Sequence, residues 1–417
     1  MPSPRRRLRA ADVERFVREQ CFAPAQQGLV GIELEQLTVA AGDPAACADH
    51  ARVRAAVATV SPLAGGSRLT FEPGGQVELS SAPLPGVTAA CAALTGDLAT
   101  VCDAVAGAGA RLLAAGLDPW RDRSRVVEEP RYRAMEAYFR SDGDEGARMM
   151  CSTAALQVNL DIGEASAQAR RWHLAHALGP TLVASFANSP LSRGAPTGRR
   201  SERAAICAAL DPSRSGPAET GTADPAGAWL QYALEAQVML IRTCAERFHP
   251  MATPLPFGRW MEEGHELGFP VLDDFEYHLG TLFPPVRPRG WLELRMVDSL
   301  PDPWWQAAAA VVAALFDDPE AADEAARASA ATAGLWADAA RHGLSHPGLA
   351  LAAATCFRAA LDALPRLGAD EATISAVGAF FERFVARGRC PADDLLDAWR
   401  RHGRLLPDPL PLESSWT

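Results

Sequence analysis

The chain has 417 residues, of which 48% are hydrophobic and 22% charged, with a formal net charge of -11. This composition is typical of a globular protein with a large core. The negative balance and the lack of a long basic run argue against a nucleic-acid partner, and the basic start of the chain, residues 1–12, is interpreted as a flexible solvated tail.

Composition also indicates where the protein is located and which phosphate-binding motif it cannot contain. The apolar run 307–316 ends at Asp317, short of the roughly 18 to 20 apolar residues that span a bilayer, so no membrane association is predicted. Nine cysteines without a CxxC pair fit reduced thiols in a cytoplasmic protein. All 40 basic residues are arginine, which excludes a Walker A phosphate loop because that motif requires lysine.

Four segments alternate apolar and polar residues as half-buried strands do: 29–39, 69–81, 154–162 and 291–298. The second contains Pro73, Gly74 and Gly75, which predict a turn or bulge between two short strands. Helical segments are predicted at 43–60, 86–115, 165–187, 226–247 and, after Pro303, to about residue 389. We expect a single α+β domain over 1–417, with a surface loop at 211–225 and a Pro-rich tail at 405–417.

Each predicted strand has one apolar face and one face of acids, amides or arginine. Glu33 and Glu35 share a face of the first strand, and Glu78 lies between Val77 and Leu79. On the third strand the polar face carries Gln157, Asn159 and Asp161, and on the fourth it carries Glu293 and Arg295.

A face exposed to water is the simplest explanation for any one of these strands. Repeated glutamates on neighbouring strands argue against it, because two carboxylates about 4 Å apart cost about 4 kcal/mol at an effective dielectric near 20. A divalent cation would relieve this repulsion. The oxygen ligands favour Mg²⁺, which commonly binds together with substrate phosphates, over zinc or iron.

Several motifs occur in an order that resembles the glutamate-cysteine ligase family, in particular its type 2, plant-like branch and the bacterial members that serve ergothioneine synthesis. They are GIELEQLTV, FEPGGQVELSSAP, RYRAMEAYF, MMCSTAALQVNLD and LFPPVRPRGWLELRMVD. The resemblance implies a glutamine-synthetase-like fold, in which a curved, mostly antiparallel sheet forms an active-site funnel. It also implies that ATP, L-glutamate and L-cysteine give γ-glutamylcysteine through a γ-glutamyl phosphate.

The same resemblance implies roles for individual residues. Two or three Mg²⁺ ions would be bound by Glu33, Glu35, Glu72, Glu78 and Glu293. Arg295 and Glu33 would be catalytic, and Arg295, Gln157 and Asn159 would contact the nucleotide. The amino-acid substrates would be bound by Arg131, Arg203, Thr281 and Arg287.

Three alternatives stay open at this point. Cys207 stands where relatives have tryptophan, so the acceptor could be an amine other than cysteine. The chain could also be a non-catalytic binding protein that kept the fold, or a kinase that releases a phosphorylated product. A monomer or a small homo-oligomer is expected.

Overall fold

The computed structural model describes residues 7–26, 28–140, 143–244 and 246–404. Its strands are β1 (Leu29–Ala40), β2 (Asp43–Cys47), β3 (Arg68–Phe71), β4 (Val77–Ser80), β5 (Leu84–Pro85), β6 (Ala110–Leu113), β7 (Ala155–Asp161), β8 (Leu191–Ser192), β9 (Ala195–Pro196), β10 (Leu240–Cys244), β11 (Arg247–Pro250), β12 (Val286–Pro288) and β13 (Trp291–Asp298).

A nine-stranded sheet in the order β12-β13-β7-β1-β4-β3, with β2, β5 and β6 also paired to β1, forms the centre of the molecule. All of its described strand pairs are antiparallel. The long strand β1 lies between β4 and β7, so residues from three separate parts of the chain stand side by side at its middle. The predicted strands and the turn between β3 and β4 are confirmed, as is the α+β class.

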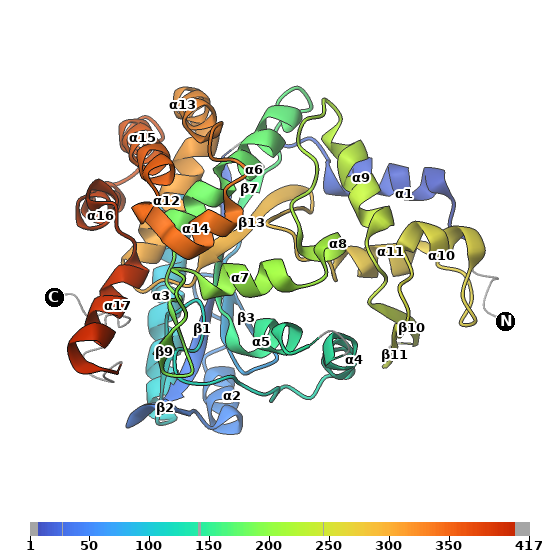
Figure 1. Cartoon of the computed structure of the whole chain (residues 1–417), viewed down its shortest axis with the longest axis horizontal. Coiled ribbons are helices and arrows are strands. Elements are labelled where there is room, and N and C mark those ends of the chain that lie inside the picture. The colour runs from blue at the N-terminus through green and yellow to red at the C-terminus, as the bar shows by residue number, and fades with distance from the viewer. Residues whose placement is uncertain (1–6, 27, 141–142, 245, 405–417) are drawn as a thin grey trace.

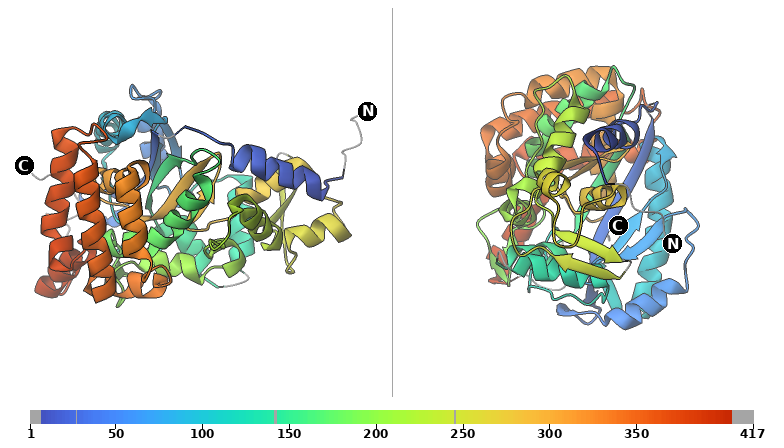
Figure 2. Two further views of the ribbon diagram at one scale, coloured as in Figure 1. Left: turned by 90° about the horizontal axis from the view of Figure 1, so that it is seen from above. Right: turned by 90° about the vertical axis from the view of Figure 1, so that its right-hand side faces the viewer.

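Helices cover the apolar face of the sheet and extend beyond it at both ends (Figure 1, Figure 2). The helices are α1 (Ala10–Phe16), α2 (His50–Ala58), α3 (Gly86–Gly107), α4 (Pro130–Phe139), α5 (Glu145–Ser152), α6 (Gln168–Ser185), α7 (Glu202–Ala209), α8 (Pro212–Ser215), α9 (Pro225–Glu235), α10 (Phe257–Glu263), α11 (Leu272–Leu279), α12 (Trp304–Asp317), α13 (Pro319–Ser329), α14 (Trp336–His342), α15 (Pro347–Ala363), α16 (Glu371–Arg383) and α17 (Pro391–His402).

The main core lies between the sheet and α3, α6 and α12. Ile32 and Leu34 of β1 and Val158 of β7 are buried there, on the face opposite the glutamates. The Ala-rich α12 is buried along almost its whole length and separates the sheet from α13, α15 and α16, which stack side by side at one end of the molecule (Figure 2). The apolar half of each alternating strand therefore has a helix layer against it, which leaves the polar half free for a site.

Helix α3 is long and apolar enough, by length and composition, to cross a membrane, contrary to the sequence-based expectation that no segment would be. In the fold it packs on β1, β6 and α12, with Leu94 and Val101 buried. Asp97, in the middle of the helix, is buried and accepts hydrogen bonds from the backbone N–H groups of Gly65 and Ser67 at 2.7 and 3.0 Å. These contacts show that one face of α3 packs against the sheet and α12.

Three predicted helices differ from the structure at one end. Residues 43–47 form β2, which pairs with β1, before α2 begins behind the N-cap Asp49. The 86–115 helix ends at Gly107 and continues as β6, and the 226–247 helix ends at Glu235 before β10. In each case pairing with another strand overrides the local helical preference of an Ala-rich or apolar run.

The predicted flexible N-terminus and the predicted surface loop contain more packed structure than the sequence indicated. In the basic start, residues 1–6 lie outside the described residues, but Leu8 is buried and Arg7 lies over the Phe269 ring at 4.0 Å, so the tail is packed from residue 7. The 211–225 loop contains α8, whose Arg214 side chain is fully buried and donates to the Thr281 carbonyl at 2.9 Å. The predicted tail 405–417 lies outside the described residues.

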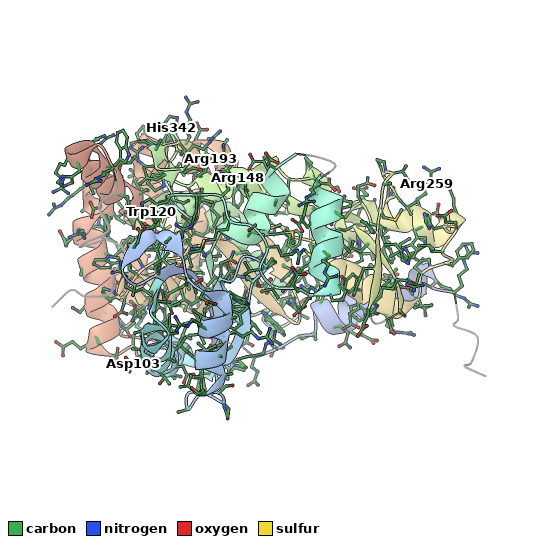
Figure 3. The ribbon with its side chains drawn as sticks, turned by 90° about the horizontal axis from the view of Figure 1, so that it is seen from below. Asp103, Trp120, Arg148, Arg193, Arg259 and His342 are labelled. Atoms are coloured by element: carbon green, nitrogen blue, oxygen red, sulfur yellow. The ribbon has the colours of Figure 1, made fainter. Side chains whose placement is uncertain are left out.

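The arginines on the surface are spread over the molecule and many pair with acids. Arg148 and Arg193 lie close together in Figure 3, and both donate to Asp122. Arg259, toward the right-hand end of the same view, donates to Glu263 at 2.8 Å. All nine cysteines are free thiols, as the sequence predicts.

The turn between β3 and β4 depends on a glycine with no room for a side chain. A Cβ at Gly74 would lie 2.0 Å from the carbonyl oxygen of Cys151. Because that obstacle is backbone, we expect Gly74→Ala to destabilise the protein by about 1–3 kcal/mol, measured by chemical denaturation.

The matched control is Gly96→Ala in α3, where an added Cβ meets nothing within 4 Å. It should be neutral or stabilise the helix by up to about 1 kcal/mol. Equal unfolding free energies for the two variants would contradict the close approach at Gly74.

Candidate active site

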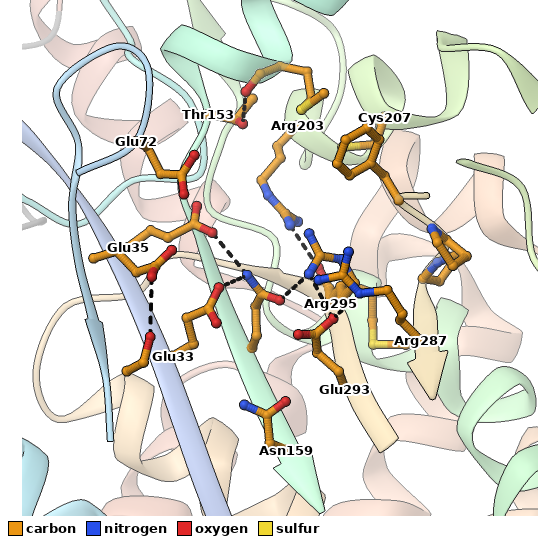
Figure 4. Close-up of a pocket in the computed structure, with 18 of the residues that line it drawn as sticks. Glu33, Glu35, Glu72, Thr153, Asn159, Arg203, Cys207, Arg287, Glu293 and Arg295 are labelled. Carbon is orange, nitrogen blue, oxygen red and sulfur yellow. Dashed lines mark hydrogen bonds and ion pairs between the residues drawn. The ribbon is translucent and has the colours of Figure 1, made fainter. Parts of the chain in front are cut away.

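The register of the central strands brings their polar residues together. Glu33 on β1 stands opposite Gln157 on β7, and Glu35 stands opposite Glu78 on β4. On the far side of β7, Asn159 stands opposite Glu293 of β13. Because side chains on antiparallel strands project to the same face at paired positions, these groups converge on one side of the sheet (Figure 4).

This face opens into a cavity of about 1750 Å³. Its floor is the polar side of the sheet, and its walls come from the β3–β4 turn, from α4, from α7 and from the connection into β12. Of the residues predicted from the sequence, the cavity is lined by Glu33, Glu35, Glu72, Glu78, Arg131, Gln157, Asn159, Arg203, Arg287, Glu293 and Arg295. A set of residues scattered over most of the chain is thus collected in one chamber.

Glu33, Glu35 and Glu78 form the tightest cluster of acids, with one oxygen from each lying within 4.8 Å of the others. Burial, followed by the neighbouring charges of Glu78, Glu293 and Glu35, raises the pKa of Glu33 to about 8. Burial and Glu78 also raise the pKa of Glu35, although the backbone N–H of Ala155 donates to it at 2.8 Å. Without a cation, Glu33 therefore keeps a proton at neutral pH.

Neighbouring groups only partly offset the repulsion among these three carboxylates. The Gln157 amide donates to both Glu33 and Glu35, at 3.0 Å in the second case. Thr70 and Ser80 donate to Glu78 at 2.5 and 3.2 Å. These neutral donors orient the carboxylates without removing their charge. The alternation of the strands did not predict that the hydroxyl groups of Thr70 and Ser80 belong to the site.

Glu293 is in a different electrostatic state. Its carboxylate accepts from Arg287 at 2.6 Å and from Arg295 at 2.9 Å. Burial opposes ionisation, but Arg287 and Arg295 outweigh it and lower the pKa of Glu293 to about 2. Glu293 is thus an ionised carboxylate whose charge is already balanced, which makes it a weaker metal candidate than the cluster of three.

Arg295 connects the two halves of the floor. The Nη1 atom donates to Gln157 at 2.5 Å as well as to Glu293, and the guanidinium lines the cavity. Burial works against its charge, but Glu293, Glu33 and Glu35 together raise the pKa of Arg295 above its usual value. The guanidinium therefore stays charged and faces the acids, as a phosphate-binding group would.

Glu72 stands at the start of the turn after β3 and points toward the acid cluster (Figure 4). Burial and the charge of Glu78 raise its pKa well above the usual range. It lines the cavity but lies outside the cluster of three. Its predicted role as a metal ligand stays a prediction.

Three of the four predicted substrate-binding residues line the cavity, and the fourth does not. Arg203 on α7 and Arg131 on α4 line the cavity, and Arg131 lies over the Tyr132 ring at 4.7 Å. Arg287 also lines the cavity, but its guanidinium already donates to Glu293 and, at 3.0 Å, to the Leu282 carbonyl. Thr281 is not among the lining residues.

Thr281 is buried at the end of α11, and its hydroxyl donates to the His278 carbonyl at 2.7 Å. Its own carbonyl accepts from Arg214 at 2.9 Å. These contacts fix the connection into β12, so the structure gives Thr281 a role in the wall and not a position facing substrate. The run "HLGTLFPPVRPRG" predicted a residue near the cavity but could not show which way its side chain points.

The acid cluster fits a divalent cation on chemical grounds. Its donors are all carboxylate oxygens, they approach one another closely, and burial together with the neighbouring acids raises the pKa values of Glu33 and Glu35. Hard cations such as Mg²⁺ prefer such ligands. The described residues place no histidine or cysteine in this cluster, which fits the prediction of magnesium over zinc.

Comparison with known proteins identifies the family. Residues 29–408 match glutamate-cysteine ligase family 2. The chain belongs to this family. Glutamate-cysteine ligase EgtA of Mycolicibacterium smegmatis is 43% identical over 379 residues, which cover 89% of this chain and 87% of the relative. EgtA of Mycobacterium tuberculosis (strain CDC 1551 / Oshkosh) is 41% identical over 395 residues, covering 92% and 88%.

More distant relatives agree with this placement in glutamate-cysteine ligase family 2. The chloroplastic glutamate-cysteine ligase A of rice, Oryza sativa subsp. indica, is 34% identical over 246 residues, 57% of this chain and 49% of the relative. A solved structure of a bifunctional glutathione synthetase from Pasteurella multocida has a TM-score of 0.50 at 15% identity, over 90% of this chain and 50% of that chain. This last likeness concerns the fold alone. The resemblance to the plant-like branch is confirmed.

The raised pKa of Glu33 predicts that metal binding displaces protons. Below about pH 8 the metal-free site keeps a proton on Glu33, so Mg²⁺ must compete with it. We expect the affinity for Mg²⁺ to rise between about pH 6 and about pH 9, with proton release visible by calorimetry in buffers of different ionisation enthalpy. Glu33→Gln should reduce the number of protons released, and a pH-independent affinity would contradict the assignment.

The raised pKa of Glu33 also determines whether the free energy of unfolding rises or falls with pH. The pKa of Glu33 is about 8 in the fold and near the ordinary 4.5 when unfolded, so the folded protein binds more protons between these values. Without metal, the contribution of Glu33 to the free energy of unfolding should fall as pH rises from about 4.5 through about 8. Saturating Mg²⁺ should flatten this decline in thermal melts, and Glu33→Gln should remove it.

Proposed function

We propose that the chain is an ATP-dependent ligase that joins the side-chain carboxylate of L-glutamate to the amine of L-cysteine, giving γ-glutamylcysteine. The observation that carries this proposal is the convergence of three close carboxylates and two arginines, Arg203 and Arg295, in one cavity. The relatives that match nearly the whole chain are themselves named glutamate-cysteine ligases, which supports the choice of substrates.

The proposed reaction has two balanced steps. In the first, the γ-phosphoryl group moves from ATP to the glutamate side-chain carboxylate, and ADP leaves. In the second, the cysteine amine attacks the acyl carbon, the new C–N bond forms, the bond to phosphate breaks, and the amine loses a proton. Such chemistry asks a protein chiefly to position reactants and to neutralise phosphate charge.

Mg²⁺ would be held by Glu33, Glu35 and Glu78, and a second or third ion would recruit Glu72 or Glu293. When bound there, Mg²⁺ would supply positive charge that offsets the charge developing on the transferred phosphoryl group. Gln157 holds two of these carboxylates in place through its amide. Its carbonyl is in turn fixed by Arg295, so the acid cluster and the phosphate-facing arginine form one connected unit.

The arginines divide between phosphate and amino acid. Arg295 stands beside the acid cluster, where a transferred phosphoryl group would lie, and we assign it the phosphate oxygens. Arg203 on α7 and Arg131 on α4 also line the cavity, and we assign them the carboxylate of glutamate. Asn159 and the exposed Trp291, whose indole N–H donates to it at 3.1 Å, lie at one edge of the cavity and suit the nucleotide.

The matching relatives suggest the fate of the product. Because the matching mycobacterial proteins carry the name EgtA, we propose that the product feeds ergothioneine synthesis. The nine free thiols support the proposed cytoplasmic location. Cys207 in the cavity wall keeps another acceptor amine as the second candidate.

A coupled assay of phosphate release with a panel of amines tests the proposal. We expect turnover to require ATP, Mg²⁺, glutamate and cysteine together, with γ-glutamylcysteine identified by mass spectrometry. Equal turnover with cysteine and L-α-aminobutyrate would overturn the cysteine assignment. ATP consumption at full rate without any amine would indicate a kinase instead.

Removing single carboxylates tests the metal roles. We expect Glu33→Gln and Glu78→Gln each to lower kcat/KM by about 100-fold or more, because each leaves an incomplete ligand set. Glu263→Gln is the control, since its exposed carboxylate pairs with Arg259 at the far end of the molecule. Wild-type activity in both cluster variants would refute the metal assignment.

A further inference from the structure

A buried carboxylate that does not line the cavity connects β13 to the start of α7. Asp298, at the end of β13, is 1% exposed. Its Oδ2 accepts from the backbone N–H of Asn188 at 2.8 Å and from the Ser189 hydroxyl at 2.7 Å. Its Oδ1 accepts from the Ser201 hydroxyl at 3.0 Å and lies 3.6 Å from Nη1 of Arg203.

Arg203 is held from several sides by this arrangement. Its Nη2 donates to the Arg295 carbonyl at 2.7 Å, while Nη1 faces Asp298. Its backbone N–H donates to the Ser189 hydroxyl at 3.2 Å, which itself donates to Asp298. Both the backbone and the guanidinium of Arg203 are therefore tied to the last residues of β13.

The helix that carries Arg203 is anchored by the same carboxylate. Ser201 is the N-cap of α7 and accepts from the backbone N–H of Ala204 at 3.1 Å. Since its hydroxyl proton goes to Asp298, the cap fixes where α7 begins relative to the sheet. The Asp298 carboxylate thus fixes both the start of α7 and the position of the Arg203 side chain on that helix.

We propose that Asp298 is a positioning residue that presents the Arg203 guanidinium to the carboxylate of the amino-acid substrate. This rests on the proposed function, in which Arg203 binds glutamate. An arginine side chain has many rotamers, and fixing it before substrate arrives lowers the entropic cost of binding. Asp298 itself does not reach the cavity, so its effect on substrate passes through Arg203.

A double-mutant cycle tests this relation. We expect Asp298→Asn to raise KM for glutamate between about 10-fold and 100-fold, with KM for ATP unchanged within about twofold. Arg203→Gln should do the same. In the double variant the two effects should not multiply, because the loss of Arg203 removes the group through which Asp298 acts.

Asp118→Asn is the matched control for the loss of a buried, paired carboxylate. Asp118 is 1% exposed, accepts from Arg123 at 2.7 Å and does not line the cavity. It should cost stability without changing KM for glutamate. A purely structural Asp298 would behave as this control does, or its effect would multiply with that of Arg203→Gln, and either result would overturn the proposal.

Ser189→Ala keeps the test decisive if Asp298→Asn does not fold. It removes one donor to Asp298 and the acceptor of the Arg203 backbone N–H, and leaves the Ser201 cap in place. We expect a smaller rise in KM for glutamate, and an unchanged KM would count against the proposal. Failure of the proposed function is distinguishable, since the wild-type protein would then form no γ-glutamylcysteine at all.

Discussion

The repulsion among three close carboxylates is the constraint on which the rest of this structure depends. Glu33, Glu35 and Glu78 lie within reach of one ion, and burial with mutual charge raises the pKa values of the first two. A fold would tolerate this arrangement only if a cation or protons relieve it. Glu293 differs, because Arg287 and Arg295 donate to its carboxylate and already balance its charge. The cluster of three is instead the set of carboxylates that we propose as metal ligands.

Rigid architecture holds this cluster in place. The antiparallel register sets Glu35 against Glu78 and Glu33 against Gln157, while α3, α6 and α12 hold the opposite face of the sheet. A one-residue slip of β1 would turn its glutamates into the core, so the packing of Ile32 and Leu34 also fixes the site. Stability and ligand geometry therefore share the same strands.

The sequence predicted the floor of the site better than its walls. Period-two alternation directly gives the faces of β1, β7 and β13, and the family motifs supply their order. Alternation could not predict that 43–47 and 240–244 form strands, since each pairs with the strand next to it in the chain, β1 or β11, against the helical preference of its own residues. Nor could it show that Thr281 points into the wall, or that Asp298 closes a hydrogen-bond network with Ser189 and Ser201, because these depend on how a loop and a helix start meet the sheet.

The most direct measurement is the anomalous diffraction of Mn²⁺, used in place of Mg²⁺, in crystals of this protein with ATP analogue and glutamate. The convergence of carboxylates predicts an anomalous peak at roughly 2.0 to 2.6 Å from oxygens of Glu33, Glu35 and Glu78. Crystals at saturating Mn²⁺ that show no peak there, with the three side chains turned away from one another, would contradict the central role of a cation in this fold.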